Sequence, residues 1–422
     1  MSALSFAPGT PLPAAEAEEM GFLPERLARL GAAMRHFIDG GKVPNLVTLV
    51  ARQGRVVHFE ARGFLELEAH KPVERDAIFR LYSNSKPIAG LATMILFEEG
   101  LLTPDDPISK FIPAFKNPQV RISDQPGLTE PARREITVRD CLRHTSGLAT
   151  LARTPLQARA QYPNEMRALG WATPDAGVGA APTARERVEA LARLPLSFQP
   201  GSAYEYHAGY IVIGAIIETL TEMSLDAFYR ERIFAPLGMV DSDFYLDESK
   251  RDRFTACYRP ERREGDWVLT VTDRAESSEK VRGPKVLFAA GGDEGGVLST
   301  VADYARFGQM LLNGGELDGV RLVGRKTVEL MTSDHSEGVL MPSRGPGFGW
   351  GLGVAMRNGA GGLPTMRSLG AYGWSGAAGT QYLADPKEGL LLVCFTQVMN
   401  HLAMPDNTYW EEFERIVYQS LS

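Results

Sequence analysis

The sequence has few residues of the kinds that form disulfide frameworks or hold metals. Its three cysteines, Cys141, Cys257 and Cys394, are far apart and stand in partly apolar segments, so we expect buried thiols. The seven histidines show no H-E-x-x-H pattern or other metal-ligand spacing. The sequence therefore predicts neither a metal site nor a cofactor.

Long apolar runs and dense basic blocks are missing as well. No uninterrupted apolar stretch approaches the roughly 18 residues that a membrane span needs, and the N-terminus lacks the pattern of a secretory signal. We expect a cytoplasmic protein, unless a leader has been removed, with no membrane partner. A net charge of −7 without a Lys/Arg block disfavours nucleic acid. The expected partner is a small molecule, and the sequence indicates no oligomeric state.

The composition that remains is that of an ordinary folded protein. The 422 residues are 44% hydrophobic and 23% charged, which is enough for one large or two fused domains with a substantial core.

Strand patterns occur near both ends of the chain. Two β-branched runs on either side of residues 53–55 predict an antiparallel hairpin over 46–62. Further strands are predicted at 348–356, 378–385 and 389–397, with a turn at 385–389 between the last two. Helices are predicted at 300–313, after a capping pattern that begins at Ser299, and at 408–420.

The middle of the chain, from about 105 to 285, has short helical segments broken by polar or Pro/Gly stretches, and a charged loop at 261–284. The fold class is therefore α+β: an antiparallel β-sheet flanked by helices, with an inserted helical domain. We assign residues 1–113 and 289–422 to the sheet domain and residues 114–288 to the insertion, and expect the functional site in the cleft between them.

The first chemical signal is Ser83-Asn84-Ser85-Lys86. From Ser83 to Gly100 the apolar residues have helical spacing, which predicts a buried helix. A lysine three residues after a serine lies on the same helix face, and burial disfavours its charged form, so neutral Lys86 could take the Ser83 proton. The helix N-terminus also offers N–H groups to an oxyanion.

This motif is weak by itself. A second copy, Ser277-Ser278-Glu279-Lys280, stands in a charged segment without an apolar helix behind it, and is not expected to be catalytic. For Ser83 the alternative is an ordinary helix cap with a solvated lysine, so further motifs must decide.

Three further segments stand in a matching order along the chain. They are Leu142-Arg143-His144-Thr145-Ser146-Gly147-Leu148, the stretch Phe198–Tyr210 with a Pro-Gly turn before Tyr206, and Tyr372–Thr380 with Trp374-Ser375-Gly376. With Ser83 and Lys86, they resemble the serine β-lactamase and penicillin-binding-protein superfamily over residues ~30 to 400. The chain looks most like class C β-lactamases and, closer still, the family VIII carboxylesterases.

The resemblance implies the roles of the site residues. Ser83 would be the nucleophile, and Lys86 and Tyr206 would handle protons. The amides of Ser83 and Ala377 would form the oxyanion hole. Gly376 would let substrate approach the backbone, and His207 would line the cleft or face solvent.

Two departures favour neutral esters over β-lactams. Class C enzymes have Tyr-x-Asn in the second motif, where this chain has Tyr206-His207-Ala208. They have Lys-Thr-Gly in the third, where Trp374 replaces the cation that would help to hold a substrate carboxylate. Trp374 is expected in the pocket wall, with plain core packing as the alternative, and Tyr206 could likewise be a core tyrosine.

The predicted function is hydrolysis of short-chain carboxylic esters through an acyl-enzyme on Ser83. Alternatives on the same residues are β-lactam, peptide or amide hydrolysis and acyl transfer, and a non-catalytic binding protein is the alternative of another class. A Ser-His-Asp triad with His144 is disfavoured, since the family treats that segment as structural, and no G-x-S-x-G elbow is present. Residues 149–195 and 335–347 are expected to shape the pocket.

Overall fold

The computed structural model describes residues 12–123, 127–150, 162, 164–165, 184–278, 280, 296–362 and 364–422. Its helices are α1 Pro24–Leu27, α2 Arg29–Asp39, α3 Lys86–Glu98, α4 Val138–Leu142, α7 Ala184–Arg193, α8 Gly209–Thr221, α9 Leu225–Tyr229, α10 Ala235–Leu237, α11 Val301–Leu312, α12 Arg325–Thr332 and α13 Tyr409–Gln419. Its strands are β1 Asn45–Arg52, β2 Arg55–Glu66, β3 Lys71–Pro72, β4 Phe79–Arg80, β5 Gln119–Arg121, β6 Thr129–Pro131, β7 Cys257–Arg263, β8 Asp266–Asp273, β9 Leu298–Ser299, β10 Glu316–Leu317, β11 Val320–Arg321, β12 Phe348–Trp350, β13 Ala355–Arg357, β14 Tyr372–Ser375, β15 Gln381–Asp385 and β16 Leu390–Phe395.

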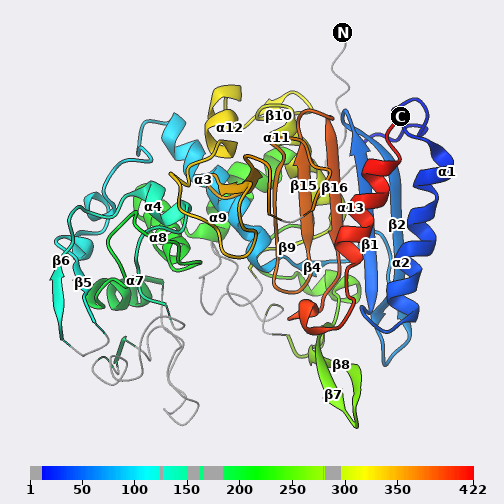
Figure 1. The fold of residues 1–422 in the computed structure, drawn as a ribbon, viewed down its shortest axis with the longest axis horizontal. Coiled ribbons are helices and arrows are strands. Elements are labelled where there is room, and N and C mark those ends of the chain that lie inside the picture. Colours follow the sequence, from blue (N-terminus) through cyan, green and yellow to red (C-terminus); the bar gives the residue numbers. More distant parts are fainter. Residues whose placement is uncertain are drawn as a thin grey trace.

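Eight of these strands form one antiparallel sheet, in the order β12-β13-β14-β15-β16-β1-β2-β3. The two ends of the chain meet at its centre, where β1 pairs with β16 and Val47 lies opposite Phe395 (Figure 1). The predicted fold class, an antiparallel sheet built from both termini and flanked by helices, is confirmed.

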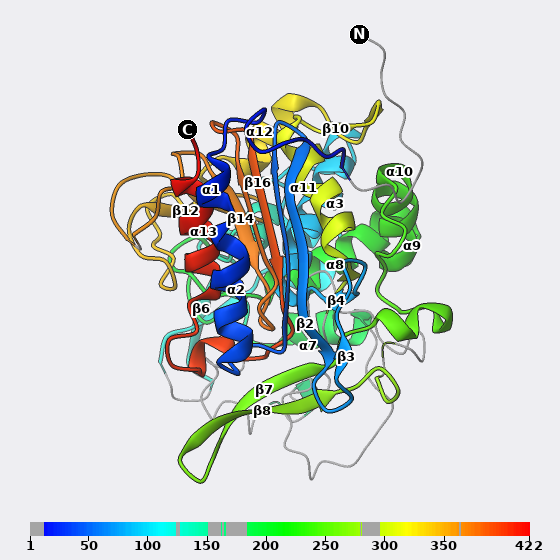
Figure 2. The same cartoon turned by 90° about the vertical axis from the view of Figure 1, so that its right-hand side faces the viewer.

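Both faces of the sheet are covered, which explains why β16 reads as one apolar run. Leu391, Val393 and Phe395 belong to the larger core, and the alternate residues of β16 to the smaller one. The helices α1, α2 and α13 lie along the face of the smaller core, and α11 packs on the opposite face (Figure 2). The alternation follows from the two-residue period of a strand.

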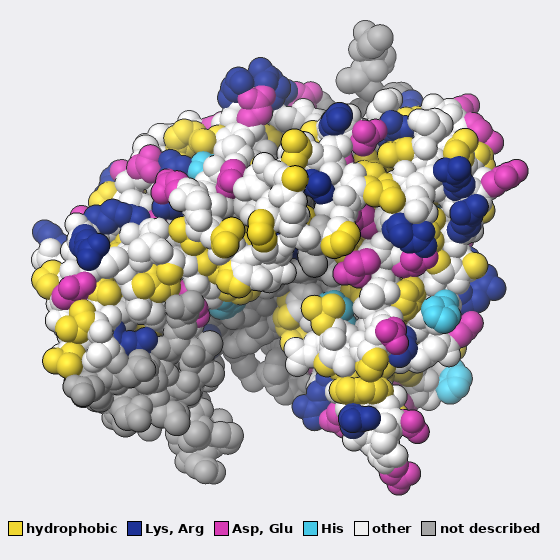
Figure 3. Space-filling view, in the orientation of Figure 1, with side chains coloured by type: hydrophobic (Ala, Val, Ile, Leu, Met, Phe, Trp, Pro, Cys, Tyr) yellow, Lys and Arg dark blue, Asp and Glu magenta, His cyan; other side chains and the backbone are white. Residues whose placement is uncertain are grey.

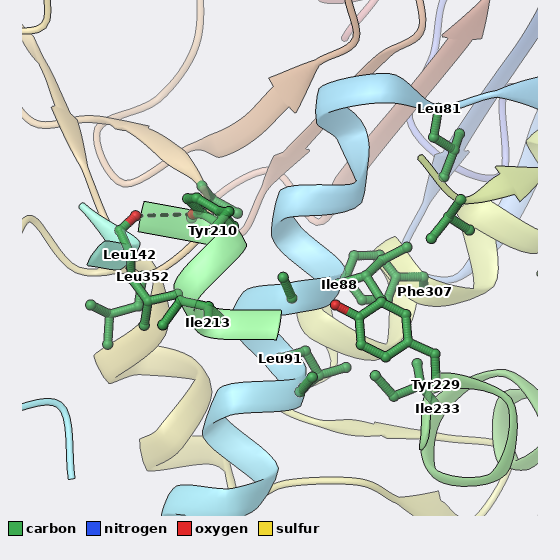
Figure 4. Close-up of a cluster of buried hydrophobic side chains, with 14 of the residues drawn as sticks. Leu81, Ile88, Leu91, Leu142, Tyr210, Ile213, Tyr229, Ile233, Phe307 and Leu352 are labelled. Atoms are coloured by element: carbon green, nitrogen blue, oxygen red, sulfur yellow. Dashed lines mark hydrogen bonds between the residues drawn. The ribbon is translucent and has the colours of Figure 1, made fainter. Parts of the chain in front are cut away.

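The remaining helices extend the larger core away from the sheet. Helix α3 is buried from Lys86 to Leu96, and α8 packs against it and against α4. Figure 4 shows the apolar side chains between them, with the hydroxyl of Tyr210 donating a hydrogen bond to the carbonyl of Leu142 at 2.9 Å. This contact fixes the start of α8 beside the end of α4.

Most predicted elements are confirmed with shifted ends, and three are corrected. The α-helix begins at Lys86, because Tyr82–Ser85 form a 3-10 turn. The segment 348–356 contains two short strands, since residues 351–354 turn between β12 and β13. The charged segment 261–284 is not a loop in its first part, where β7 and β8 pair across a tight turn at Glu264-Gly265, both with positive φ.

The middle of the chain is less purely helical than predicted. Besides α4 and α7 to α10, its described part contains the hairpins β5–β6 and β7–β8, and β7 also bridges to Val398 of the sheet part. The division into 1–113 with 289–422 and 114–288 stays a prediction.

Charges of both signs are interspersed on the face drawn in Figure 3. Within the described residues, no helix is long and apolar enough to cross a membrane, and no cluster of three or more His, Cys, Asp or Glu side chains could hold a metal ion. Cys141, Cys257 and Cys394 are all buried free thiols, as predicted.

Candidate active site

Ser83 lies in the 3-10 turn that leads into α3, and this turn is held from several sides. The hydroxyl of Ser85 accepts a hydrogen bond from the Val297 amide at 3.0 Å, and the carbonyl of Asn84 accepts one from the Tyr304 hydroxyl at 2.8 Å. Tyr82, directly before Ser83, has a φ of 48°, a left-handed conformation that is uncommon for a bulky residue. The turn therefore presents Ser83 on a constrained backbone, as functional sites often do.

Lys86 is completely buried, and its Nζ lies beside the Ser83 hydroxyl. The distance from Nζ to Ser83 Oγ is 3.0 Å, and a second contact of 3.3 Å joins Nζ to His207 Nδ1. The ring centroid of Tyr206 lies 4.4 Å from Nζ and that of Tyr210 5.3 Å. Lys86 is therefore buried against two tyrosine rings, with its nitrogen within hydrogen-bond distance of Ser83 and His207.

Tyr206 and Trp374 are joined by a hydrogen bond. The indole Nε1–H of Trp374 donates to the Tyr206 hydroxyl oxygen at 2.8 Å, and the Trp374 ring packs edge-on against Trp350 at 4.4 Å between centroids. Trp374 thus lines the cavity, as predicted, and also orients Tyr206. Because it donates to the phenol oxygen, the indole favours the phenolate form of Tyr206 over the neutral form.

His144 holds the loop that contains Tyr206. Its carbonyl accepts the Glu205 amide at 2.9 Å, and its Nδ1 accepts the His207 amide at 3.0 Å. Burial, and then the charge of Lys86, hold the pKa of His144 well below its usual value, so the ring is neutral and its Nδ1 is an acceptor. His207 has a φ of 98°, a strained conformation that this loop imposes. These contacts place His144 as a support of the loop, in line with the structural role that was predicted for it.

Gly376 lies against the Ser83 turn. A Cβ atom at Gly376 would stand 2.2 Å from the carbonyl oxygen of Leu81, and the Gly376 amide donates to Thr380 at 2.7 Å. The glycine is therefore required by a close approach between β14 and the backbone just before Ser83. The predicted role of Gly376, access for substrate to the backbone, stays a prediction.

Ser83, Tyr206, Trp374, Gly376 and Ala377 line one cavity of about 890 Å³. Ala377 is exposed there, and none of the described residues accepts a hydrogen bond from its amide. An N–H group in this position can donate to an oxyanion. Lys86 and His207 lie behind this lining, in contact with one another.

The far wall of the cavity comes partly from segments that the sequence did not single out. Pro342, Ser343 and Arg344 fall within the predicted stretch 335–347, whereas most of the stretch 149–195 lies outside the described residues. The connection between β16 and α13, together with the first turn of α13, was missed as part of the cavity. It contributes Asn400, His401, Leu402, Ala403 and Asn407 from the connection and Tyr409, Trp410 and Glu411 from the helix. No motif marks this segment, because its role depends on where the last strand ends.

In the second serine–lysine motif, Ser278 and Lys280 form hydrogen bonds with other parts of the protein. Ser278 is buried and donates to a carboxylate oxygen of Asp273 at 2.9 Å, and Lys280 donates to the carbonyl of Gly296 at 2.9 Å. Glu279, inside the motif, lies outside the described residues.

Residues 30–413 match the family model described as Beta-lactamase. The chain belongs to the β-lactamase family. The superfamily resemblance drawn from the motifs is thereby confirmed, and the protein is a serine hydrolase of the β-lactamase and penicillin-binding-protein group.

Relatives within this family have different descriptions. Esterase EstB of Burkholderia gladioli is 27% identical over 87% of this chain and 90% of its own length. A putative D-alanyl-D-alanine carboxypeptidase of Escherichia coli is 28% identical over 89% of this chain and 83% of its own length. The solved structure of EstCE1, a hydrolase with promiscuous acyltransferase activity, superposes with a TM-score of 0.73 at 26% identity and covers 93% of this chain and 99% of its own.

Proposed function

We propose that this serine hydrolase is a carboxylesterase that cleaves short-chain esters through an acyl-enzyme on Ser83. Two contacts beside the cavity carry the proposal. The buried Lys86 Nζ lies 3.0 Å from Ser83 Oγ, and the Trp374 indole, in place of a lysine, donates a hydrogen bond to Tyr206. Similarity to the esterase EstB supports the ester substrate, and similarity to EstCE1, a hydrolase with acyltransferase activity, supports acyl transfer to Ser83.

In the first step, neutral Lys86 takes the proton of Ser83 as Oγ attacks the ester carbonyl carbon. The carbonyl π electrons move to oxygen, where the amides of Ser83 and Ala377 stabilise the negative charge. When the tetrahedral intermediate collapses, the bond to the alcohol oxygen breaks and the Tyr206 hydroxyl protonates the leaving alkoxide. The acyl group remains on Ser83, and the proton on Lys86 returns to the Tyr206 phenolate.

In the second step, a water oxygen bonds to the acyl carbon while neutral Lys86, with Tyr206 beside it, takes one proton from that water. When the tetrahedral intermediate collapses, the bond from the acyl carbon to Ser83 Oγ breaks, the carboxylic acid leaves, and the same proton passes to Ser83 Oγ.

The test compares hydrolysis of 4-nitrophenyl butyrate with opening of a chromogenic cephalosporin, for the wild type and Ser83→Ala. We expect the ester to be the faster substrate and its turnover to fall at least ~10³-fold in the variant, as for other activated nucleophiles. Full activity in Ser83→Ala would exclude the mechanism.

Cephalosporin turnover without ester turnover would favour a β-lactamase on the same site. A non-catalytic binding protein predicts no covalent adduct, so labelling with a fluorophosphonate and mass spectrometry of the Ser83 peptide separates it from both enzymes. Peptide hydrolysis is the further alternative that the Escherichia coli relative suggests. Release of D-alanine from a D-Ala-D-Ala peptide would support it.

A further inference from the structure

The cavity beside Ser83 contains a cation from another part of the chain. Trp374 takes the position of a lysine in class C enzymes. The loss of that positive charge led to the prediction of neutral substrates. Arg344, in the loop between α12 and β12, lines the same cavity, and among the described lining residues it is the one lysine or arginine. This inference rests on the proposed esterase function and concerns the class of ester.

The Arg344 guanidinium lies among aromatic rings. Its Cζ is 5.6 Å from the ring centroid of Trp374 and 5.8 Å from that of Phe348. Aromatic faces attract a cation, but they leave its N–H donors without acceptors. Arg344 therefore packs against Trp374, the residue that takes the position of the class C lysine.

No described residue forms an ion pair or a side-chain hydrogen bond with Arg344. The neighbouring Arg367 differs, since it pairs with Glu414 at 2.5 Å from nitrogen to oxygen. Burial, followed by the charge of Arg367, lowers the pKa of Arg344 to about 10, so the group is still charged at neutral pH. Arg344 is half-buried, and a partly desolvated guanidinium without a protein carboxylate beside it gains from an incoming one.

Two acidic residues also line the cavity, and neither neutralises Arg344 by contact. Glu205 accepts a short hydrogen bond from the Thr150 hydroxyl, and Glu411 is exposed at the start of α13, where solvent screens its charge. The planar fork of donors on Arg344 thus stays available to a ligand inside the cavity.

We propose that Arg344 binds a carboxylate of the substrate, so that the preferred substrates are esters with an anionic group. The guanidinium would form a bidentate pair with that carboxylate while Ser83 attacks the ester carbonyl. Anionic esters should then be turned over faster than neutral esters of the same size.

The experiment uses two matched pairs of esters. 4-Nitrophenyl hydrogen adipate against 4-nitrophenyl hexanoate places the charge on the acyl side, and 4-(butyryloxy)benzoate against phenyl butyrate places it on the alcohol side. For each pair the ratio of kcat/KM, anionic over neutral, is measured for the wild type, Arg344→Gln and Arg344→Lys. The control is Arg415→Gln, which removes an exposed charge on the outer side of α13.

We expect the ratio of at least one pair to fall about ten-fold in Arg344→Gln, with kcat/KM of the neutral esters nearly unchanged. Arg344→Lys should restore the ratio in part, and Arg415→Gln should leave it unchanged. A fall of less than three-fold in both pairs would overturn the inference.

A binding measurement tests the carboxylate site independently of whether the protein hydrolyses esters. Monomethyl adipate is titrated calorimetrically into Ser83→Ala, and into the double variant that also has Arg344→Gln. Weaker binding to the double variant supports the carboxylate site even where no ester is turned over, and equal binding contradicts it. If the wild type hydrolyses none of the esters, this result would count against the proposed function and not against the carboxylate site.

Discussion

Trp374 has two structural roles in the cavity, and a lysine at this position could not fill both. Its ring walls the cavity and supports Arg344, and its indole N–H fixes the hydroxyl of Tyr206. A lysine would place a charge at that position, whereas the indole donates one hydrogen bond without a charge. The residue that changed the expected substrate is thus also bonded to Tyr206, the residue proposed to transfer protons.

Trp374→Phe keeps an aromatic wall but removes the donor to Tyr206. One hydrogen bond of this kind is worth about 1 kcal/mol, so we expect kcat for 4-nitrophenyl butyrate to fall by roughly five- to ten-fold, with KM little changed. The pH–rate profile is the decisive readout, because the apparent pKa of the Lys86–Tyr206 pair should rise when the phenolate loses its donor. An unshifted profile would show that the hydrogen bond has no part in proton transfer.

At the scale of elements, the site depends on how closely β14 approaches the turn before α3. Gly376 allows this approach, and the Thr380 hydroxyl strengthens it by donating to the Leu81 carbonyl at 2.9 Å. The Ser83 turn and the Ala377 amide are therefore held together by backbone contacts between two distant parts of the chain. Oxyanion stabilisation requires such fixed donors.

Gly376→Ala should damage both activity and stability. The new Cβ would meet the Leu81 carbonyl at 2.2 Å, so β14 must move away from the Ser83 turn. Overpacking of this kind costs ~1–3 kcal/mol, and we expect a lower Tm together with a fall in kcat of at least about ten-fold. Gly359→Ala is the matched control, since its Cβ would meet nothing closer than 3.8 Å. Equal behaviour of the two variants would refute this account of Gly376.

At the scale of the whole molecule, several histidines are buried in a neutral state. Burial lowers the pKa of His144, His335 and His401, and lowers that of His58 to about 4. His58 also shares a 2.8 Å hydrogen bond with Thr48 of the neighbouring strand. As pH falls through 6.5, these side chains take up protons in the unfolded chain but not in the folded protein, so unfolding becomes more favourable.

The free energy of unfolding should therefore decrease between pH 7 and pH 4.5, and His58 alone should contribute on the order of 2 kcal/mol of that decrease. Urea denaturation at several pH values measures it. His58→Gln can keep the bond to Thr48 and does not titrate, so its stability should fall less steeply with acid. An identical slope in the wild type and the variant would contradict the assignment.

The sequence by itself determined the fold class, and it predicted the main members of the candidate site. Strand patterns at both ends and helical segments between them were sufficient for the sheet, because two-residue and 3.6-residue periods are local properties. The Ser83–Lys86 spacing and the segments around Tyr206 and Trp374 were readable because their residue types and order are characteristic. The break at residues 351–354 could not be predicted, because the turn between these two short strands interrupts the apolar pattern too briefly.

Only the tertiary structure decided which residues share the cavity. The hydrogen bond from Trp374 to Tyr206 joins positions 168 apart in the chain, and the contacts of Gly376 with Leu81 and of Arg344 with Trp374 are also set by packing between distant segments. Local sequence patterns do not encode such neighbours. The sequence therefore indicated an acyl-transfer site, and the packing brought Arg344 to its wall.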